Sequence, residues 1–135
     1  MEAAAQIAVS NSNLWAGRIV SGLVALFLLA DGVGKLLKPE FVVSETVRLG
    51  YPESVIIPIG VVLIVCTILY LIPKTSVLGA ILLTGYLGGA VATHVRLSNP
   101  LFTHVLFGVY VSVLMWGGLV LRQPALRNLL KGTVS

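Results

Sequence analysis

The chain has 135 residues, of which 57% are hydrophobic and only 10% are charged. Its mean hydropathy of +1.01 is too high for an ordinary soluble domain. Four spans of about 20 residues each would use roughly 80 positions and leave short loops and two tails. The composition therefore excludes an ordinary water-soluble globule and predicts a single small membrane domain over residues 1–135.

Nine Lys and Arg against five Asp and Glu give a net charge of +4. These charges stand at the ends of apolar runs, as membrane anchors do, so a nucleic-acid partner is not expected. Only Glu2 is charged before the first apolar run, and no good cleavage site follows that run, so we expect it to be retained as a span. Cys66 is the single cysteine, which excludes an intrachain disulfide and a CxxC redox centre.

The first predicted span covers about residues 14–37. The polar run 10–13 supplies candidate capping residues before it, and Lys38 with Pro39 ends it. The polar stretch that follows, up to Glu53, predicts a short interfacial segment.

Three further apolar runs predict spans over about residues 54–72, 76–96 and 101–121. The run 54–72 is too long for a strand, and we expect a helix that bends at Pro58. The short turn at Pro73 makes the second and third spans antiparallel neighbours. The predicted fold class is all-α: an integral membrane bundle of four antiparallel transmembrane helices, with a short interfacial segment between the first two.

An even number of spans places both termini on one side of the membrane. That side collects Arg18, Lys74, Arg122, Arg127 and Lys131, and the other side has Lys35, Lys38, Arg48 and Arg96. Five basic residues against four favour a multi-pass protein of the bacterial inner membrane with both termini in the cytoplasm. Trp15, Tyr70 and Trp116 near the same side are consistent with an aromatic belt.

The ionisable residues gather at the opposite end of the predicted bundle, where Asp31, Lys35, His94, Arg96 and His104 lie at helix ends. Asp31 is the strongest functional candidate, because an ionisable group inside a span usually faces protein or a water-filled cavity. The alternative is a structural pair with Lys35 at i,i+4. A pair and a site are compatible.

His94 and His104 flank a short connection between antiparallel helices, so their side chains can meet in space. Together with Asp31 they could form a two-His-one-carboxylate metal set, or hold a haem as two imidazoles. Their spacing matches no known ligand motif, so neither metal nor haem is expected. An acid/base or ligand-orienting role is favoured, which makes Asp31, His94 and His104 the candidate catalytic residues.

Gly85 and Gly89 form a GxxxG motif in the third span, which predicts close helix packing. The same motif could instead form a dimer seam. A third interpretation is that the small residues shape a groove for a flat lipophilic ligand. Its candidate ligand-binding residues are Tyr86, Lys35, Arg96, Phe107 and Met115.

Five stretches carry a resemblance to a known family: residues 30–36 (ADGVGKL), 49–52 (LGYP), 69–80, 83–96 and 116–119 (WGGL). As a set they resemble the DoxX-like family of small integral membrane proteins. The resemblance implies a four-helix membrane bundle in the company of quinone-linked oxidoreductases. It implies no defined active site.

Three functions remain open at this point. The first is binding of a lipophilic, quinone-like molecule in association with membrane redox chemistry. The second is a cofactor-independent isomerase, cyclase or hydrolase that uses Asp31 and His94 as acid and base. The third is a structural partner subunit without a ligand. The expected partners are the lipid bilayer, a lipophilic small molecule, and a second copy of the chain or a membrane oxidoreductase. The cofactor is not defined by the sequence: a quinone is possible, and haem or metal is not expected.

Overall fold

The computed structural model describes residues 2–132, with side chains from residue 12 onward. Its helices are α1 (Glu2–Leu37), α2 (Glu40–Arg48), α3 (Ile56–Leu71), α4 (Ser76–Arg96), α5 (Phe107–Arg122) and α6 (Pro124–Leu130). A 3-10 turn (Glu53–Val55) precedes α3, and a π-helical turn (Leu101–Val105) precedes α5. No strand occurs within residues 2–132, so the predicted all-α class is confirmed.

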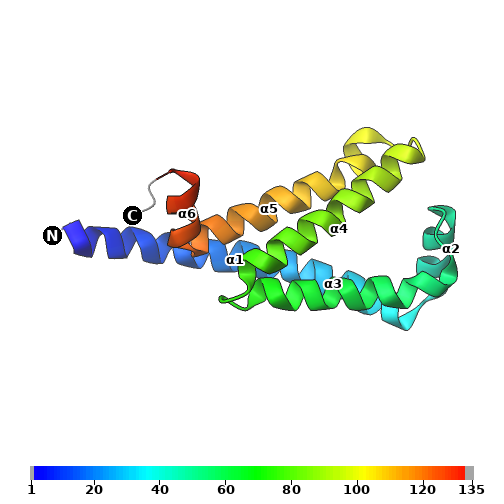
Figure 1. Cartoon of the computed structure of the whole chain (residues 1–135), viewed down its shortest axis with the longest axis horizontal. Helices are drawn as coiled ribbons and strands as arrows, with labels where there is room; N and C mark the ends of the chain where they lie inside the picture. The colour runs from blue at the N-terminus through cyan, green and yellow to red at the C-terminus, as the bar shows by residue number, and fades with distance from the viewer. Residues whose placement is uncertain (1, 133–135) are drawn as a thin grey trace.

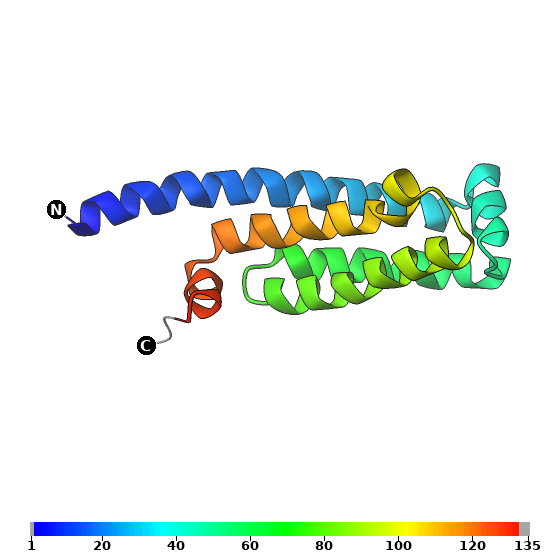
Figure 2. The same ribbon diagram turned by 90° about the horizontal axis from the view of Figure 1, so that it is seen from above.

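The four long helices form a closed ring in which α1 and α4 each pack against both α3 and α5. Figures 1 and 2 show them side by side along the long axis, with both termini at one end. Gly60 near the start of α3 lies against Lys35 near the end of α1, and Gly17 in α1 lies against Arg122 at the end of α5. These contacts show that α1 runs antiparallel to both neighbours.

Four segments are long and apolar enough to cross a membrane: Ser12–Leu37, Glu53–Leu71, Ser76–Arg96 and Leu101–Arg122. Only 28% to 33% of each apolar window is buried inside the molecule. Large apolar side chains such as Leu23, Leu26 and Val113 are more than half exposed, which suits contact with lipid tails rather than water. The chain is a multi-pass membrane protein, and the four spans agree with the predicted ranges within a few residues.

Tyr70 connects three helices in the core of the bundle. Its side chain is 0% exposed, its hydroxyl donates to the carbonyl oxygen of Met115 at 2.7 Å, and it also contacts Ser21 Oγ at 3.0 Å. A buried tyrosine hydroxyl needs such partners. The prediction of Tyr70 as part of an aromatic belt is therefore wrong.

One boundary prediction was also wrong. The polar run 10–13 lies inside α1, which begins at Glu2, so it caps no helix. Pro58 lies in the first turn of α3, where the backbone N–H groups have no partner within the helix. A proline there costs no hydrogen bond, and α3 is one continuous helix.

The GxxxG motif does not pack within the chain. A Cβ atom added at Gly85 or Gly89 would meet nothing within 4 Å. The close helix approaches use other glycines, such as Gly79, whose added Cβ would clash with the backbone nitrogen of Tyr70. The interpretation of Gly85 and Gly89 as intrachain packing residues is wrong, because their face of α4 points away from α3 and α5.

Candidate functional site

A hollow of about 400 Å³ lies between α4 and α5 and is called here the α4–α5 groove. It is lined by Thr84, Leu87, Gly88, Val91, Gly108, Val109, Ser112, Val113 and Trp116. Most of its wall is apolar, and its volume falls in the range of small-molecule sites.

Two glycines shape the α4–α5 groove in different ways. Gly108 lets α5 approach α4 closely, because a Cβ atom there would lie 2.9 Å from Val91 and 3.1 Å from the carbonyl oxygen of Leu87. Gly88 has open space where its side chain would be. The two helices are therefore in close contact at Gly108, and the groove has free space at Gly88.

The polar groups of the groove are few and differ in what they offer. Trp116 Nε1 donates to Thr84 Oγ1 at 2.8 Å, and Thr84 Oγ1 donates to the carbonyl oxygen of Ala80 at 2.7 Å. Ser112 has no hydrogen-bond partner among the described residues. Its hydroxyl is the donor that the groove can offer to a bound molecule.

The predicted pair of Asp31 and Lys35 is present at the end of the bundle that carries α2. Lys35 Nζ lies 2.8 Å from Asp31 Oδ1, with the Asp31 side chain 42% exposed. Tyr86 packs against the core from α4. Arg96 Nη2 donates to the carbonyl oxygen of Leu49 at 2.8 Å and so ties α4 to the α2–α3 connection. Asp31, Lys35 and Arg96 thus all have partners within the chain.

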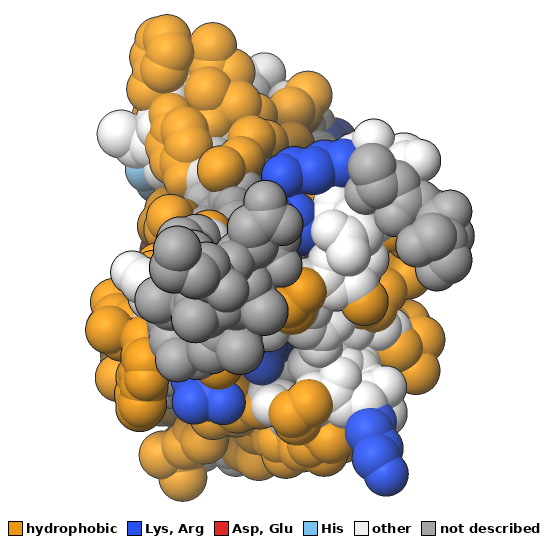
Figure 3. All heavy atoms as spheres, turned by 90° about the vertical axis from the view of Figure 1, so that its left-hand side faces the viewer, with side chains coloured by type: hydrophobic (Ala, Val, Ile, Leu, Met, Phe, Trp, Pro, Cys, Tyr) orange, Lys and Arg blue, Asp and Glu red, His pale blue; other side chains and the backbone are white. Residues whose placement is uncertain are grey.

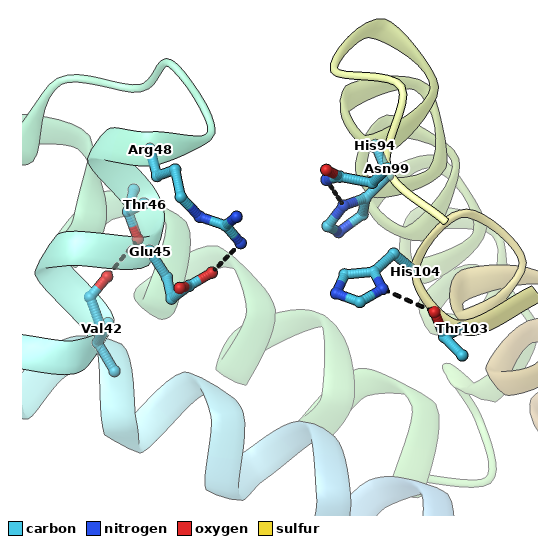
Figure 4. A network of polar contacts seen from close by, with 8 residues as sticks. All are labelled: Val42, Glu45, Thr46, Arg48, His94, Asn99, Thr103 and His104. Carbon is cyan, nitrogen blue, oxygen red and sulfur yellow. Dashed lines mark hydrogen bonds and ion pairs between the residues drawn. The ribbon is translucent and has the colours of Figure 1, made fainter. Parts of the chain in front are cut away.

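His94 and His104 meet as their positions predict. Their ring centroids lie 5.7 Å apart with the planes at 70° (Figure 4). Each Nδ1 has a local polar neighbour, Asn99 Nδ2 at 2.7 Å for His94 and Thr103 Oγ1 at 2.8 Å for His104. Figure 4 shows the ion pair of Glu45 and Arg48 on α2 facing this histidine pair.

Asp31, His94 and His104 do not come together as a metal set. Within the part of the chain that the structure describes, no three His, Cys, Asp or Glu side chains come together as a metal site. Asp31 is paired with Lys35 and does not join His94 and His104. Asp31, His94 and His104 therefore do not form the two-His-one-carboxylate set that the sequence left open but did not favour.

Phe107 and Met115, the predicted ligand-binding residues on α5, lie outside the α4–α5 groove. Phe107 packs edge-on against Phe27 with centroids 5.5 Å apart, and Met115 is 0% exposed in the core. Neither residue lines the α4–α5 groove. Sequence analysis did not single out Ser112 or Trp116 as site residues, and both line the α4–α5 groove.

The fold defines a small multi-pass membrane protein with an apolar groove between two of its spans. Residues 19–118 match the DoxX-like family, and the chain belongs to this family. The matched range contains the whole α4–α5 groove and most of all four spans. No curated protein and no solved structure is significantly similar to the chain.

Proposed function

We propose that this membrane protein binds a flat lipophilic molecule of the quinone class in the α4–α5 groove, in association with membrane redox chemistry. The observation that carries the proposal is the groove itself. It has a volume of about 400 Å³ and a mainly apolar lining, and the Ser112 hydroxyl in it has no hydrogen-bond partner among the described residues. Ligand sites of this kind combine apolar walls with a few polar groups that orient the ligand.

The groove residues match the chemistry of a quinone. Gly88 leaves room for a planar ring, and Trp116 offers an aromatic face against which such a ring stacks. A quinone carbonyl accepts hydrogen bonds, and Ser112 has a hydroxyl to donate. An isoprenoid or alkyl tail would lie along the exposed apolar surface of α5, for example at Val113.

The family resemblance also supports the choice of a quinone. The resemblance to the DoxX-like family implies the company of quinone-linked oxidoreductases, which favours a quinone over other lipophilic molecules.

The excess of basic residues at the end with the termini favours a cytoplasmic location of both termini. We expect the ligand to enter laterally from the bilayer, because the groove lies along two membrane spans.

The two other functions predicted from sequence become outcomes of the test. A cofactor-independent enzyme would use Asp31 and His94, but Asp31 is paired with Lys35 and His94 Nδ1 lies 2.7 Å from Asn99 Nδ2. A structural partner subunit, or a homo-oligomer, needs no ligand in the groove.

Fluorescence quenching provides a direct test, because the chain has two tryptophans and one of them lines the groove. Trp15 is 61% exposed, so Trp15→Phe leaves Trp116 as the only reporter. We expect decylubiquinone to quench Trp116 saturably in lipid nanodiscs. Gly88→Leu should weaken this binding by about tenfold or more, and Ser112→Ala by about fivefold through one lost hydrogen bond.

Gly89→Leu is the matched control, since a side chain at either glycine meets nothing within 4 Å but only Gly88 lines the groove. It should leave quenching unchanged. Equal quenching curves for Gly88→Leu and Gly89→Leu would mean that the quinone only partitions into the bilayer, and the proposal would be rejected. A loss of binding in Asp31→Ala with the groove variants unaffected would favour the acid/base site instead.

A further inference from the structure

A second hollow, of about 340 Å³, lies at the end of the bundle where both termini are found, and is called here the basic cavity. Its polar lining consists of Arg18 and Ser21 from α1, Arg122 from the end of α5, and Gln123 from the α5–α6 junction. Leu71 at the end of α3 adds an apolar wall. No residue is shared with the α4–α5 groove, so this site is independent of the proposed quinone function.

Positive charge at this end of the molecule is not neutralised within the described side chains. Arg18, Lys74, Arg122, Arg127 and Lys131 gather here, and Figure 3 shows the blue Lys and Arg side chains around this face. The three ion pairs among residues 12–132 are all at the opposite end, where Lys35, Lys38 and Arg48 pair with acidic side chains. Among the described side chains, the guanidinium groups of the basic cavity therefore have no acidic partner.

The two arginines of the cavity are held differently. Arg122 Nη2 donates to the carbonyl oxygen of Tyr70, and its Cζ lies 4.7 Å from the centroid of the Tyr70 ring. The Nε atom of Arg122 is buried and has no hydrogen-bond partner among the described residues. Arg18 is exposed, with its Cζ 5.3 Å from the centroid of the Trp15 ring. One guanidinium is fixed by the core with donor capacity unused, and the other stands at the cavity mouth.

We propose that the basic cavity binds the phosphate group of an anionic membrane lipid. Guanidinium groups bind phosphate oxygens in a bidentate manner, and two of them facing one cavity match a single phosphodiester. The buried Nε–H of Arg122, which has no partner among the described residues, makes the site favour an acceptor, since buried donors are normally satisfied.

The position along the membrane normal supports a lipid as the source of the phosphate. Arg122 is the last residue of its span, so the cavity lies at headgroup level. Leu14 and Leu71 line the same cavity and offer an apolar surface where an acyl chain leaves the headgroup. A free phosphate ion would not use this surface.

Native mass spectrometry with defined lipids tests the proposal. Delipidated protein is given phosphatidylglycerol or phosphatidylcholine, and we expect one phosphatidylglycerol per chain to be retained preferentially. Arg18→Gln should weaken this retention by about tenfold or more, because it removes a charged hydrogen-bonding group from the cavity. Arg122→Lys keeps the charge but loses the planar fork, and should weaken retention while the thermal transition is followed in parallel.

Lys74→Gln is the matched control, since Lys74 is exposed at the same end but does not line the cavity. It should reduce retention by no more than about fivefold, the effect of one surface charge on an anionic lipid. Equal losses in Arg18→Gln and Lys74→Gln, or equal retention of the two lipids, would show diffuse surface attraction and overturn the proposal. Full displacement of phosphatidylglycerol by inorganic phosphate would assign the site to a free anion and overturn the lipid assignment.

Discussion

The α4–α5 groove and the basic cavity are similar in volume, about 400 and 340 Å³, and opposite in chemistry. The groove lies along the apolar length of two helices and offers one free hydroxyl at Ser112. The cavity lies where α5 ends and offers two guanidinium groups. Under the two proposals, position along the bilayer normal decides which part of a lipophilic molecule each hollow takes: rings and tails in the groove, a charged headgroup in the cavity.

The comparison is sharpest for one substitution made at both hollows. Gly17 lies beside the basic cavity, and a Cβ atom there would stand 2.6 Å from the backbone nitrogen of Arg122 and 2.7 Å from the carbonyl oxygen of Gly118. Backbone atoms cannot rotate away, so Gly17→Leu should destabilise the protein by about 3 kcal/mol or more. Gly88→Leu should cost almost nothing, because its side chain enters open space.

Thermal unfolding in detergent, followed by circular dichroism, measures both variants. Similar transition temperatures for Gly17→Leu and Gly88→Leu would contradict the tight contact of α1 with α5 beside the cavity.

A smaller difference in stability is expected between Tyr70, a core residue that contacts Ser21 and Arg122 of the basic cavity, and Trp116 in the groove. Tyr70→Phe leaves the buried Ser21 hydroxyl without its partner and should cost about 1 kcal/mol. Trp116→Phe removes a hydrogen bond to Thr84 that is exposed to the surroundings, and should cost roughly 0.5 kcal/mol. Reversible unfolding in mixed micelles gives both values, and a larger loss for Trp116→Phe would reverse the assignment of core and groove.

The smallest effect is expected at the third polar region, the pair of Asp31 and Lys35. Because Asp31 is 42% exposed, a double-mutant cycle of Asp31→Ala and Lys35→Ala should give a coupling free energy of about 0.5 kcal/mol. Neither change should alter binding of decylubiquinone or phosphatidylglycerol. Weaker quinone binding in Asp31→Ala at unchanged stability would return Asp31 to the ligand site.

The sequence predicted the spans and the local pairs well, for physical reasons. Continuous apolar runs of about 20 residues leave few alternatives to membrane helices, and residues 40–48 form the expected short helix α2. The pair of Asp31 and Lys35 follows from helical spacing. The meeting of His94 and His104 follows from the short connection between their helices.

Which side of each helix faces protein could not be predicted. Ser112 and Met115 are three positions apart on α5, yet one lines the groove and the other is 0% exposed. In a membrane both faces of a helix are apolar, so hydropathy carries little information about rotation. The same reason explains why Gly85 and Gly89 were assigned to packing while Gly17 and Gly79 make the close approaches.

The central claim is that the α4–α5 groove is a ligand site, and photoaffinity labelling with an azidoquinone tests it most directly. The account predicts label on peptides covering residues 84–91 and 108–116, competed by decylubiquinone, lost in Gly88→Leu and retained in Gly89→Leu. Label spread evenly over other lipid-facing positions, such as Leu23 on α1 and Val62 on α3, would contradict it.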